Sequence, residues 1–403
     1  MQRAMVLPGP ADDELAAVVH SMLDDHWVPE GYAAPNSLVY PWQWLWDSCF
    51  HVLVWLALGD VDRSQRELAV ALTPQVSSGF VPHMHYVRQP GFHEDLWGRR
   101  TGSSITQPPM YGHAVAELAR AGYPPDDDVV DRAAAGLWFL LRGRRRDPSG
   151  LVRVCHPWET GADDSPRWDD YCPGGFEVER WRMVKNRLVS TIETGPDGEA
   201  LANPVFEVAP AGFNALVAFN ARELASVTCD DELAAAADGL VDALADRWDD
   251  RLGTWVDAGP ATGPAVGGSE RCRTLDALLP LLVEEDVQRA DRVIDQLLDP
   301  AAHGGPAGPS GVHRGESVFD PDAYWRGPVW PQLAYLMVQA VATNSTVAAD
   351  DLARHPDACP RDFRRSSPTG RSPRRPACRA PARPGSAPRS RSGRTGPGAG
   401  GGR

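Results

Sequence analysis

The chain is short of lysine, of paired cysteines and of long apolar runs. Among its 403 residues and 40 basic side chains, Lys185 is the single lysine, a bias toward arginine that is typical of GC-rich coding DNA. Its seven cysteines are scattered, odd in number and without a CxxC pair, which argues against structural zinc and against a disulfide framework. Free and mostly buried thiols in a reducing compartment fit this pattern better.

The absence of long apolar runs and of excess positive charge limits where the protein can be located and what it can bind. The first residues, MQRAMVLP, lack the apolar core of a signal peptide, and no segment approaches the length of a membrane span. A net charge of −14 argues against nucleic acid as the main partner of the folded part. We therefore expect a cytoplasmic protein without membrane contact.

Helical periodicity dominates what the chain does contain. About ten helices with little strand predict an all-α fold, and helices alternating around one core favour a toroid over a solenoid, since no fixed repeat is present. After an acidic loop, residues 172–208 look irregular, with a hairpin expected between Arg187–Thr191 and Val205–Val208. The expected helices are Asp12–Trp27, Gln43–Leu58, Arg63–Leu72, Tyr111–Ala121, Asp127–Leu141, Phe213–Val227, Asp230–Trp248, Glu270–Val283, Val287–Leu298 and Pro331–Ala342.

The composition changes near residue 357. Residues 361–403 contain twelve arginines and a single acid, and are otherwise mostly Pro, Gly, Ser and Ala. Such a segment cannot bury apolar surface, so we expect a folded domain over 1–356 and a disordered tail over 357–403. Two interpretations of the tail stay open: a basic arm that binds RNA, and an out-of-frame translation of GC-rich DNA.

The run HPWETGADDSPRWDDY (156–171) carries the most functional information. Its Pro and Gly content predicts a loop, yet it holds three large aromatic residues beside five carboxylates. Aromatic faces can stack on sugar rings, carboxylates can bind hydroxyls, and one carboxylic acid can protonate a glycosidic oxygen. The alternatives are a solvated acidic loop or a metal loop, although the calcium-loop pattern is absent.

Other aromatic and polar clusters fall at helix starts or in loops. Trp42, Trp44, Trp46 and Asp47 lie at the start of the second expected helix, where a binding role competes with a place in the core. A buried carboxylate there needs partners, which core packing alone does not supply. If the helices form a toroid, such helix starts converge on one end and line a single cleft.

Three further residues have both a functional and a structural interpretation. His83 stands two residues from His85, but with no third ligand at useful spacing we expect hydrogen-bonding histidines and no metal site. Gln107 precedes a pair of prolines and has an amide suited to a sugar diol. Arg326 can bind a carboxylate through two parallel hydrogen bonds, or form a structural ion pair.

Five of these motifs together resemble the signatures of the mannosylglycerate and glucosylglycerate hydrolases. This group belongs to the glycoside hydrolase family of the processing α-glucosidases. The motifs occur in family order over about residues 35–345: YPWQWLWDSCF (40–50), GFVPH (79–83), SITQPP (104–109), ETGADDSPRW (159–168) and YWRGPVW (324–330).

The resemblance implies an (α/α)6 barrel, an inverting mechanism, no cofactor and no metal. It implies that Asp163 is the general acid, and that 172–208 is a lid over the glycerate end of the pocket. Like charges at Asp164, Glu159 or Asp169 would keep Asp163 protonated. The expected substrate-binding residues are Trp46, Asp47 and Gln107 in subsite −1, Trp325 and Arg326 in the wall of the cleft, and Tyr40, Trp44, His83 and Trp168 in the same motifs.

One departure from the family pattern concerns the general base, which we do not find in the sequence. The family places a Glu in a Phe-Ala-Glu-Tyr-like motif near the C-terminus, where this chain reads RDFRRSSPTG (361–370). An inverting enzyme needs this second carboxylate to activate water. The last two barrel helices are also not apparent, which predicts a barrel incomplete at its C-terminal end. A frameshift or divergence near residues 345–360 would explain both.

Three functional hypotheses follow. The first is an inverting α-glycosidase acting on a small glycoside such as glucosylglycerate or mannosylglycerate, inactive as written if the base is missing. The second is a catalytically dead sugar-binding or regulatory protein. The third is a nucleic-acid-binding protein that acts through its arginine-rich tail. Since members of the family often associate, a homo-oligomer is an open alternative to a monomer.

Overall fold

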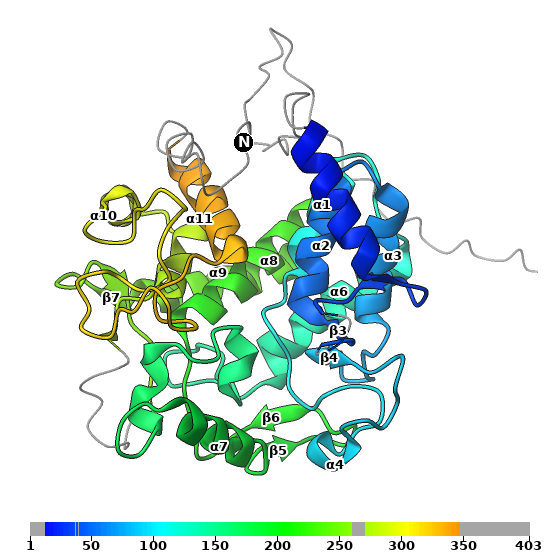
Figure 1. The fold of residues 1–403 in the computed structure, drawn as a ribbon, viewed down its shortest axis with the longest axis horizontal. Coiled ribbons are helices and arrows are strands. Elements are labelled where there is room, and N and C mark those ends of the chain that lie inside the picture. The colour runs from blue at the N-terminus through cyan, green and yellow to red at the C-terminus, as the bar shows by residue number, and fades with distance from the viewer. Residues whose placement is uncertain (1–12, 37, 39, 260–270, 346–403) are drawn as a thin grey trace, which may run out of the picture. The chain divides into compact units, whose positions relative to one another are not determined.

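The computed structural model describes residues 13–36, 38, 40–259 and 271–345, and these residues are mainly helical (Figure 1). The α-helices are α1 (Asp13–His26), α2 (Leu45–Ala57), α3 (Val61–Leu72), α4 (Glu94–Trp97), α5 (Tyr111–Arg120), α6 (Asp127–Trp138), α7 (Val178–Val189), α8 (Ala211–Thr228), α9 (Asp231–Ala245), α10 (Val287–Leu298) and α11 (Pro331–Asn344). A π-turn, η2 (Phe139–Gly143), extends α6, and 3-10 segments form η3 (Pro157–Thr160), η4 (Pro166–Tyr171) and η6 (Leu275–Leu282).

The strands of the described part form four two-stranded antiparallel ladders. Each strand is only two or three residues long, so the ladders do not build a sheet layer; three are local hairpins, and one joins segments on either side of α2 and α3. They pair β1 (Trp27–Val28) with β2 (Tyr32–Ala33), β3 (Gln43–Trp44) with β4 (Met84–His85), β5 (Glu193–Thr194) with β6 (Ala200–Ala202), and β7 (Trp248–Asp249) with β8 (Thr254–Trp255).

The long helices alternate between an inner and an outer ring. The inner elements α2, α5, α8, η6 and α11 each pack against the next along the chain, and α8 also packs on α9. In Figure 1, α8 lies between α2 and α3 on one side and α9 and α11 on the other. The inner elements α5, α8 and η6 are buried along nearly their whole length. The outer helix α3 has a buried and a solvent-facing side.

Hydrogen bonds between polar side chains and the backbone lock the inner elements together. Asn220 of α8 accepts a hydrogen bond from the backbone N–H of His113 at the start of α5, at 2.7 Å. Asn214, also on α8, accepts from the N–H of Val152 at 2.7 Å. Both asparagines are fully buried, so these bonds satisfy polar groups that would otherwise destabilise the core.

The expected helices are largely confirmed, and the exceptions have local causes. Asp230 caps α9 by accepting a hydrogen bond from Leu233 N, and Asp286 caps α10 by accepting one from Gln288 N. The expected helix at Glu270–Val283 is instead the 3-10 segment η6, which contains Pro280. Proline has no N–H and clashes with the preceding turn of an α-helix.

The stretch 172–208 differs most from its sequence interpretation. It is not irregular, because α7 occupies Val178–Val189 and the hairpin β5–β6 follows it at the lower edge of Figure 1. The hairpin predicted between Arg187–Thr191 and Val205–Val208 is therefore wrong. Arg187 belongs to the last turn of α7, and Val208 bridges to Val154 instead. A lysine on the buried face of α7 weakened the apolar periodicity that would have revealed the helix.

The described residues supply five inner elements and five outer helices, the latter being α1, α3, α6, α9 and α10. A barrel of six helical hairpins needs one more inner and one more outer helix, and any such pair after α11 would lie outside the described residues. The predicted tail over 357–403 also lies outside them. The inner helices α11 and α2 meet where Tyr335 contacts Phe50 edge to face at 6.1 Å.

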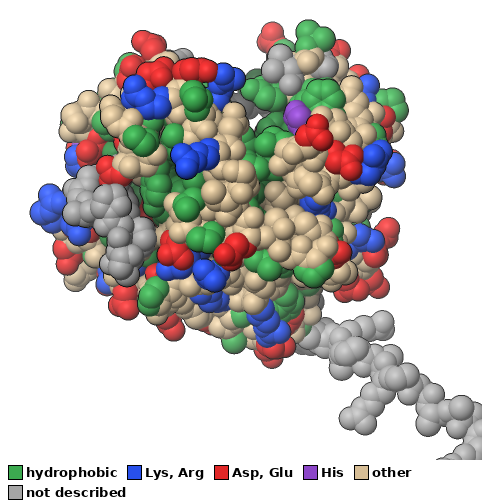
Figure 2. Space-filling model, turned by 90° about the horizontal axis from the view of Figure 1, so that it is seen from below, with side chains coloured by type: hydrophobic (Ala, Val, Ile, Leu, Met, Phe, Trp, Pro, Cys, Tyr) green, Lys and Arg blue, Asp and Glu red, His purple; other side chains and the backbone are tan. Residues whose placement is uncertain are grey.

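The surface mixes both signs of charge. Figure 2 shows one face, where Asp and Glu side chains are interspersed with Lys and Arg and are not gathered by sign. Within the part of the chain that the structure describes, no helix is both long enough and apolar enough to cross a bilayer. Cys49, Cys155, Cys172 and Cys272 are free, and the first three are buried, as the sequence predicted; Cys229 is disulfide-bonded, so the expectation of free thiols is wrong there.

Candidate active site

The acidic loop folds into two short 3-10 turns with Asp163 between them. Each turn, η3 and η4, begins with a proline, whose fixed φ favours a helical start. Gly161 follows η3 in a left-handed conformation with φ of 73°, and the chain reverses there toward Asp163. The loop is therefore rigidly folded although its composition is that of a loop.

Glu159 ties this loop to the rest of the site. Its carboxylate is fully buried and pairs with the buried Arg144, with Nη1 donating to Oε1 at 2.9 Å. The same carboxylate accepts hydrogen bonds from the backbone N–H groups of Thr106 at 3.1 Å and Cys155 at 2.6 Å. All of these hydrogen-bond donors belong to the protein itself. Glu159 therefore has a structural role and joins the acidic loop to the segment that carries Gln107.

The carboxyl group of Asp163 is held in a state suited to donating a proton. Its pKa is raised to about 7, chiefly because burial disfavours the charged form; the cation of Lys185 opposes this, and the negative charges of Asp164 and Asp47 add to it. A carboxylic acid with such a pKa is substantially protonated near neutrality. Asp163 is also only partly buried, so a ligand can reach it.

The cause of this shift differs in part from the sequence expectation. Burial ranks first, and of the three anions predicted to act on Asp163 only Asp164 contributes. Glu159 is neutralised by Arg144. Asp169 pairs with Arg326 on the opposite side of the loop, with Nη1 of the arginine donating to Oδ2 at 3.1 Å. The unexpected contributor is Asp47, at the start of α2, whose own pKa is raised by burial.

Trp46 and Gln107 lie together with the acidic loop. The backbone N–H of Trp46 donates to Oε1 of Gln107 at 3.3 Å, which joins the first turn of α2 to the segment before α5. The Trp46 ring lies against Gly161, where an added Cβ would come within 2.4 Å of the ring. The start of α2, the segment before α5 and the acidic loop therefore meet at one end of the helical ring, as the toroid hypothesis requires.

Tyr40, Trp44 and His83 form a second aromatic group beside this cluster. Tyr40 is 49% exposed and contacts Trp44 edge to face at 5.7 Å. The Trp44 ring in turn meets the buried His83 ring at 5.4 Å. Nδ1 of His83 shares a hydrogen bond of 2.5 Å with the hydroxyl of Ser103, and burial lowers its pKa to about 3. His83 is thus a neutral, hydrogen-bonded histidine, as the sequence suggested.

Trp42 and Trp44 lie before α2, and not within the start of a helix as the sequence predicted. Trp44 has extended φ and ψ and caps α2, which begins at Leu45. It pairs with Met84 in the β3–β4 ladder. Trp42 packs in a separate aromatic group with the buried Tyr86 and the exposed Phe92.

Trp168 and the residues around Trp325 have mainly structural contacts. Trp168 is 1% exposed, and its indole N–H donates to Ala162 O at 2.8 Å, so its ring supports the loop and offers no open face. Trp325 has a φ of 59° and stacks on Trp330 with ring centres 4.2 Å apart. Arg326 is buried in its pair with Asp169, which is the structural alternative left open by the sequence.

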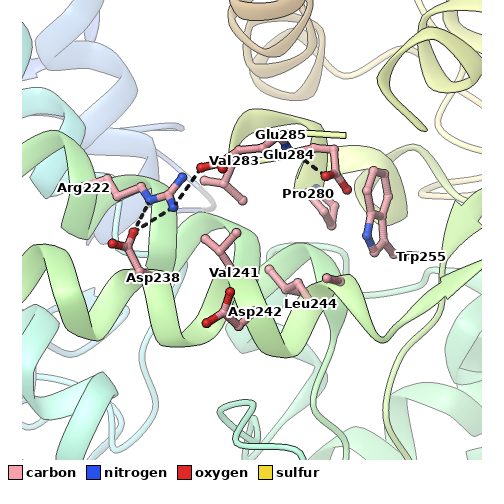
Figure 3. Close-up of a pocket in the computed structure, with 11 residues that line it drawn as sticks. Arg222, Asp238, Val241, Asp242, Leu244, Trp255, Pro280, Val283, Glu284 and Glu285 are labelled. Atoms are coloured by element: carbon pink, nitrogen blue, oxygen red, sulfur yellow. Dashed lines mark hydrogen bonds and ion pairs between the residues drawn. The ribbon is translucent and has the colours of Figure 1, made fainter. Parts of the chain in front are cut away.

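A cavity of about 360 Å³ lies elsewhere, between α8, α9 and the end of η6 (Figure 3). Arg222 spans its mouth and pairs with Asp238 at 2.7 Å and Glu285 at 3.4 Å. Its lining includes none of the residues predicted to bind substrate. We therefore place the candidate active site at the acidic loop and not in this cavity.

One group of potential metal ligands within the described ranges is already occupied by an arginine. His113, Glu117 and Glu223 bring ligand atoms within 4.8 Å of one another, but Arg120 donates to Glu117 at 2.8 Å and to Glu223 at 3.0 Å. His113 bonds Glu223 at 3.0 Å and Tyr335 at 2.8 Å. This network links α5, α8 and α11 as an ion-pair cluster.

Comparison with known proteins identifies the family behind this geometry. Residues 40–358 match the model of the mannosylglycerate hydrolase MGH1-like glycoside hydrolase domain. The chain belongs to this family. It is 27% identical over 379 residues to a mannosylglycerate hydrolase of Thermus thermophilus, covering 80% of this chain and 88% of that protein. It is also 27% identical over 364 residues to a glucosylglycerate hydrolase of Mycolicibacterium hassiacum, covering 75% and 80%.

A solved structure of this MGH1-like family shows the same fold. The crystal structure of the GH63 mannosylglycerate hydrolase from Thermus thermophilus, in complex with Tris and D-glycerate, superposes with a TM-score of 0.68 at 24% identity, covering 84% of this chain and 91% of that one. The predicted (α/α)6 barrel is thereby confirmed, and the chain is a glycoside hydrolase by family.

Residue-by-residue reasoning on the sequence missed several parts of the MGH1-like site. Arg144 and Lys185, which pair with Glu159 and Asp164, lie outside the quoted motifs, Arg144 just after an expected helix and Lys185 in the stretch 172–208 that was expected to be irregular. Arg167 lies within a quoted motif, but its pairing with Asp257 at 3.2 Å and Asp276 at 2.9 Å is invisible in sequence. The one available signal was compositional, since Lys185 is the only lysine in the chain.

Proposed function

We propose that this chain is an inverting α-glycosidase for a small glycoside of glycerate, mannosylglycerate or glucosylglycerate, with Asp163 as the general acid. The observation that carries the proposal is the setting of Asp163: this partly buried residue, whose pKa is raised to about 7 chiefly by burial, lies in the loop that packs against Trp46. The names of the Thermus and Mycolicibacterium relatives support the substrate class.

In this proposal each residue of the cluster has a separate task. Asp163 donates its proton to the glycosidic oxygen as the bond to the anomeric carbon breaks. Trp46, which is 5% exposed, offers the sugar ring a small apolar surface, and Asp47 accepts hydrogen bonds from sugar hydroxyls. The amide nitrogen of Gln107 donates a hydrogen bond to a sugar hydroxyl. The amide oxygen is not available for this, because it already accepts a hydrogen bond from Trp46 N. Tyr40 and Trp44 line the outer approach.

The water-activating carboxylate of an inverting enzyme would stand roughly 6.5–9.5 Å from Asp163. Within the described residues we assign no base, and the segment 361–370, where the family pattern would place it, lies outside them. We propose that the reading frame diverges near residues 345–360 and that the catalytic domain ends near residue 356. The frame hypothesis fails if neither alternative frame of the DNA encodes a Phe-Ala-Glu-Tyr-like segment.

The test compares the chain as written with a version whose frame is restored past residue 345. Both are incubated with mannosylglycerate and glucosylglycerate, released sugar is assayed, and its anomeric form is followed by NMR. Turnover by the restored protein with the β-anomer formed first, abolished in Asp163→Asn, supports an inverting hydrolase. Turnover by the chain as written would show that another carboxylate acts as the base and that the interpretation of the tail is wrong.

A second candidate function is sugar binding without hydrolysis. It is favoured by the one observation that Asp163 has no assigned base partner among the described residues. Isothermal titration of the chain as written with each glycoside separates the two functions. Binding that Trp46→Ala weakens, without product release, supports the binding protein, whereas product release excludes it.

A further inference from the structure

The chain uses arginine for its basic residues at every position except one. Of the 40 basic side chains one is a lysine and the rest are arginines. Arginine forms the buried ion pairs of this protein, at Arg144, Arg167 and Arg326. The exception, Lys185, lies beside the proposed acid. A chain this biased keeps lysine where a guanidinium does not serve, because the two cations differ in length, shape and hydrogen-bond geometry.

Lys185 lies on the buried face of α7 and points at the acidic loop. It is 8% exposed, and its Nζ stands 2.5 Å from Oδ1 of Asp164, the residue next to the acid. The rings of Trp158 and Trp181 each lie 5.8 Å from the same nitrogen, within the range of cation–π attraction. Arginine is longer by one bond and ends in a planar fork, so it could not occupy this space without displacing Asp164 or a ring.

Two further bonds make α7 a clamp on the acidic loop. The indole N–H of Trp181 donates to the backbone oxygen of Asp163 itself at 2.9 Å. The backbone oxygen of Lys185 accepts a hydrogen bond from Nε2 of His156 at 2.9 Å. Together with the Lys185–Asp164 pair, these bonds bind α7 to the loop before, at and after the acid.

We propose that Lys185 is a positioning residue for the reaction: its compact ammonium group fixes Asp164 and offsets that residue's negative charge next to Asp163, which arginine cannot do. This inference rests on the proposed role of Asp163 as the acid. It adds a specific cation to the site and explains why α7 lies against the acidic loop.

The charged groups around Asp163 define what Lys185 changes. Asp164 on the same loop and Asp47 of α2 raise the pKa of Asp163, and Lys185 of α7 lowers it. Tyr324, before α11, faces the acid, since the negative charge of Asp163 helps raise the pKa of its phenol. His156, which touches Lys185, is neutral because burial lowers its pKa to about 3. Removing the ammonium alone would leave Asp164 as an uncompensated anion at the acid.

The test measures the titration of Asp163 in the full chain without relying on turnover. Thermal unfolding is followed from pH 4 to 9 for a protein and its Asp163→Asn derivative. The difference in stability between the two proteins grows with pH and stops growing at the folded-state pKa of Asp163. In the Lys185→Met background we expect this pH to rise by about one unit. The matched control is Arg182→Met on the exposed face of α7, where the arginine pairs with Glu179, and it should leave the value unchanged.

Two further variants decide whether Lys185 positions the acid through Asp164 or only stabilises the fold. We call the pH at which the stability difference stops growing the levelling pH. Lys185→Met/Asp164→Asn removes both charges, and we expect its levelling pH to return to within about half a unit of the unsubstituted value. This double variant also decides the question if Lys185→Met alone does not fold. Lys185→Arg should lower the unfolding temperature by roughly 2 °C or more through overpacking.

The inference is overturned if Lys185→Met leaves the levelling pH in place, if the double variant stays shifted by a full unit, or if Lys185→Arg matches the unsubstituted chain in both measurements. If the pH at which the difference levels off shifts in a protein that neither binds nor hydrolyses either glycoside, the proposed function is refuted, and only the effect of Lys185 on the titration of Asp163 remains.

Discussion

Replacing Asp163 by asparagine should make the protein more stable at neutral and alkaline pH. In the unfolded chain the carboxyl titrates near the ordinary aspartate pKa of 3.8, and in the folded protein its pKa is about 7. A raised folded pKa adds stability that is fully present below pH 3.8 and is lost as the pH rises to about 7. Asparagine resembles the protonated acid and does not ionise, so the variant escapes this loss.

The size of the effect follows from the pKa difference. A difference of about 3 units corresponds to at most about 4 kcal/mol at 1.36 kcal/mol per unit. Because Asp163 keeps some contact with solvent, we expect roughly 2–4 kcal/mol above pH 8 and little below pH 4.5. For a domain of this size about 1.5 °C accompanies each kcal/mol, so the unfolding temperature should rise by roughly 3–6 °C.

The assay is calorimetric or fluorescence-detected unfolding of both proteins at several pH values. The control is Asp131→Asn, which changes an exposed aspartate on α6 and should show no pH-dependent gain. A gain of equal size at pH 4.5 and pH 8 would refute the argument, since it would mean that asparagine improves packing and that Asp163 does not titrate between these values. A loss of stability above pH 8 would show that Asp163 is stabilised as the anion.

The remaining predictions concern the support of the site. Gly161→Ala should reduce glycoside binding at least about tenfold, measured by titration calorimetry, because its Cβ would meet the Trp46 ring at 2.4 Å; Gly122→Ala, with φ of 90° and open space, controls for backbone strain. Glu159→Gln should lower the free energy of unfolding in urea by about 3–5 kcal/mol, since it leaves Arg144 buried without its charge partner. The exposed pair disrupted by Glu179→Gln should change it by less than about 1 kcal/mol, and equal losses in the two variants would contradict this account.

The fold was predictable from sequence wherever one helix face is apolar and the ends carry caps. α9 and α10 follow Asp230 and Asp286, and each of these aspartates caps its helix. α7 escaped because its buried face includes Lys185 and because arginine and glutamate interrupt its apolar residues. The proline in η6 was visible, but its effect on helix type depends on tight packing between α8 and α11.

The site was predictable as a set of motifs and not as a set of roles. Motif order brought Trp46, Gln107 and Asp163 into one interpretation, and the structure places them at one end of the barrel. Which carboxylate carries a free charge depends on long-range partners such as Arg144 and Arg326. No periodicity or spacing rule connects residues so far apart in sequence.

The residues that support proton donation by Asp163 lie in a different part of the chain from the base that would activate water. The electrostatic neighbours of Asp163, which are Asp47, Asp164 and Lys185, together with Glu159 and the clamp α7, all come from the first half of the chain. A defect after residue 345 would therefore remove water activation without disturbing the acid or the Trp46 face. If the reading frame does diverge there, the protein should bind its glycoside and keep the pKa of Asp163 near 7 while turning nothing over. Sugar binding without hydrolysis would then mark a damaged hydrolase and not a separate class of protein, and restoring the missing carboxylate alone would convert one into the other.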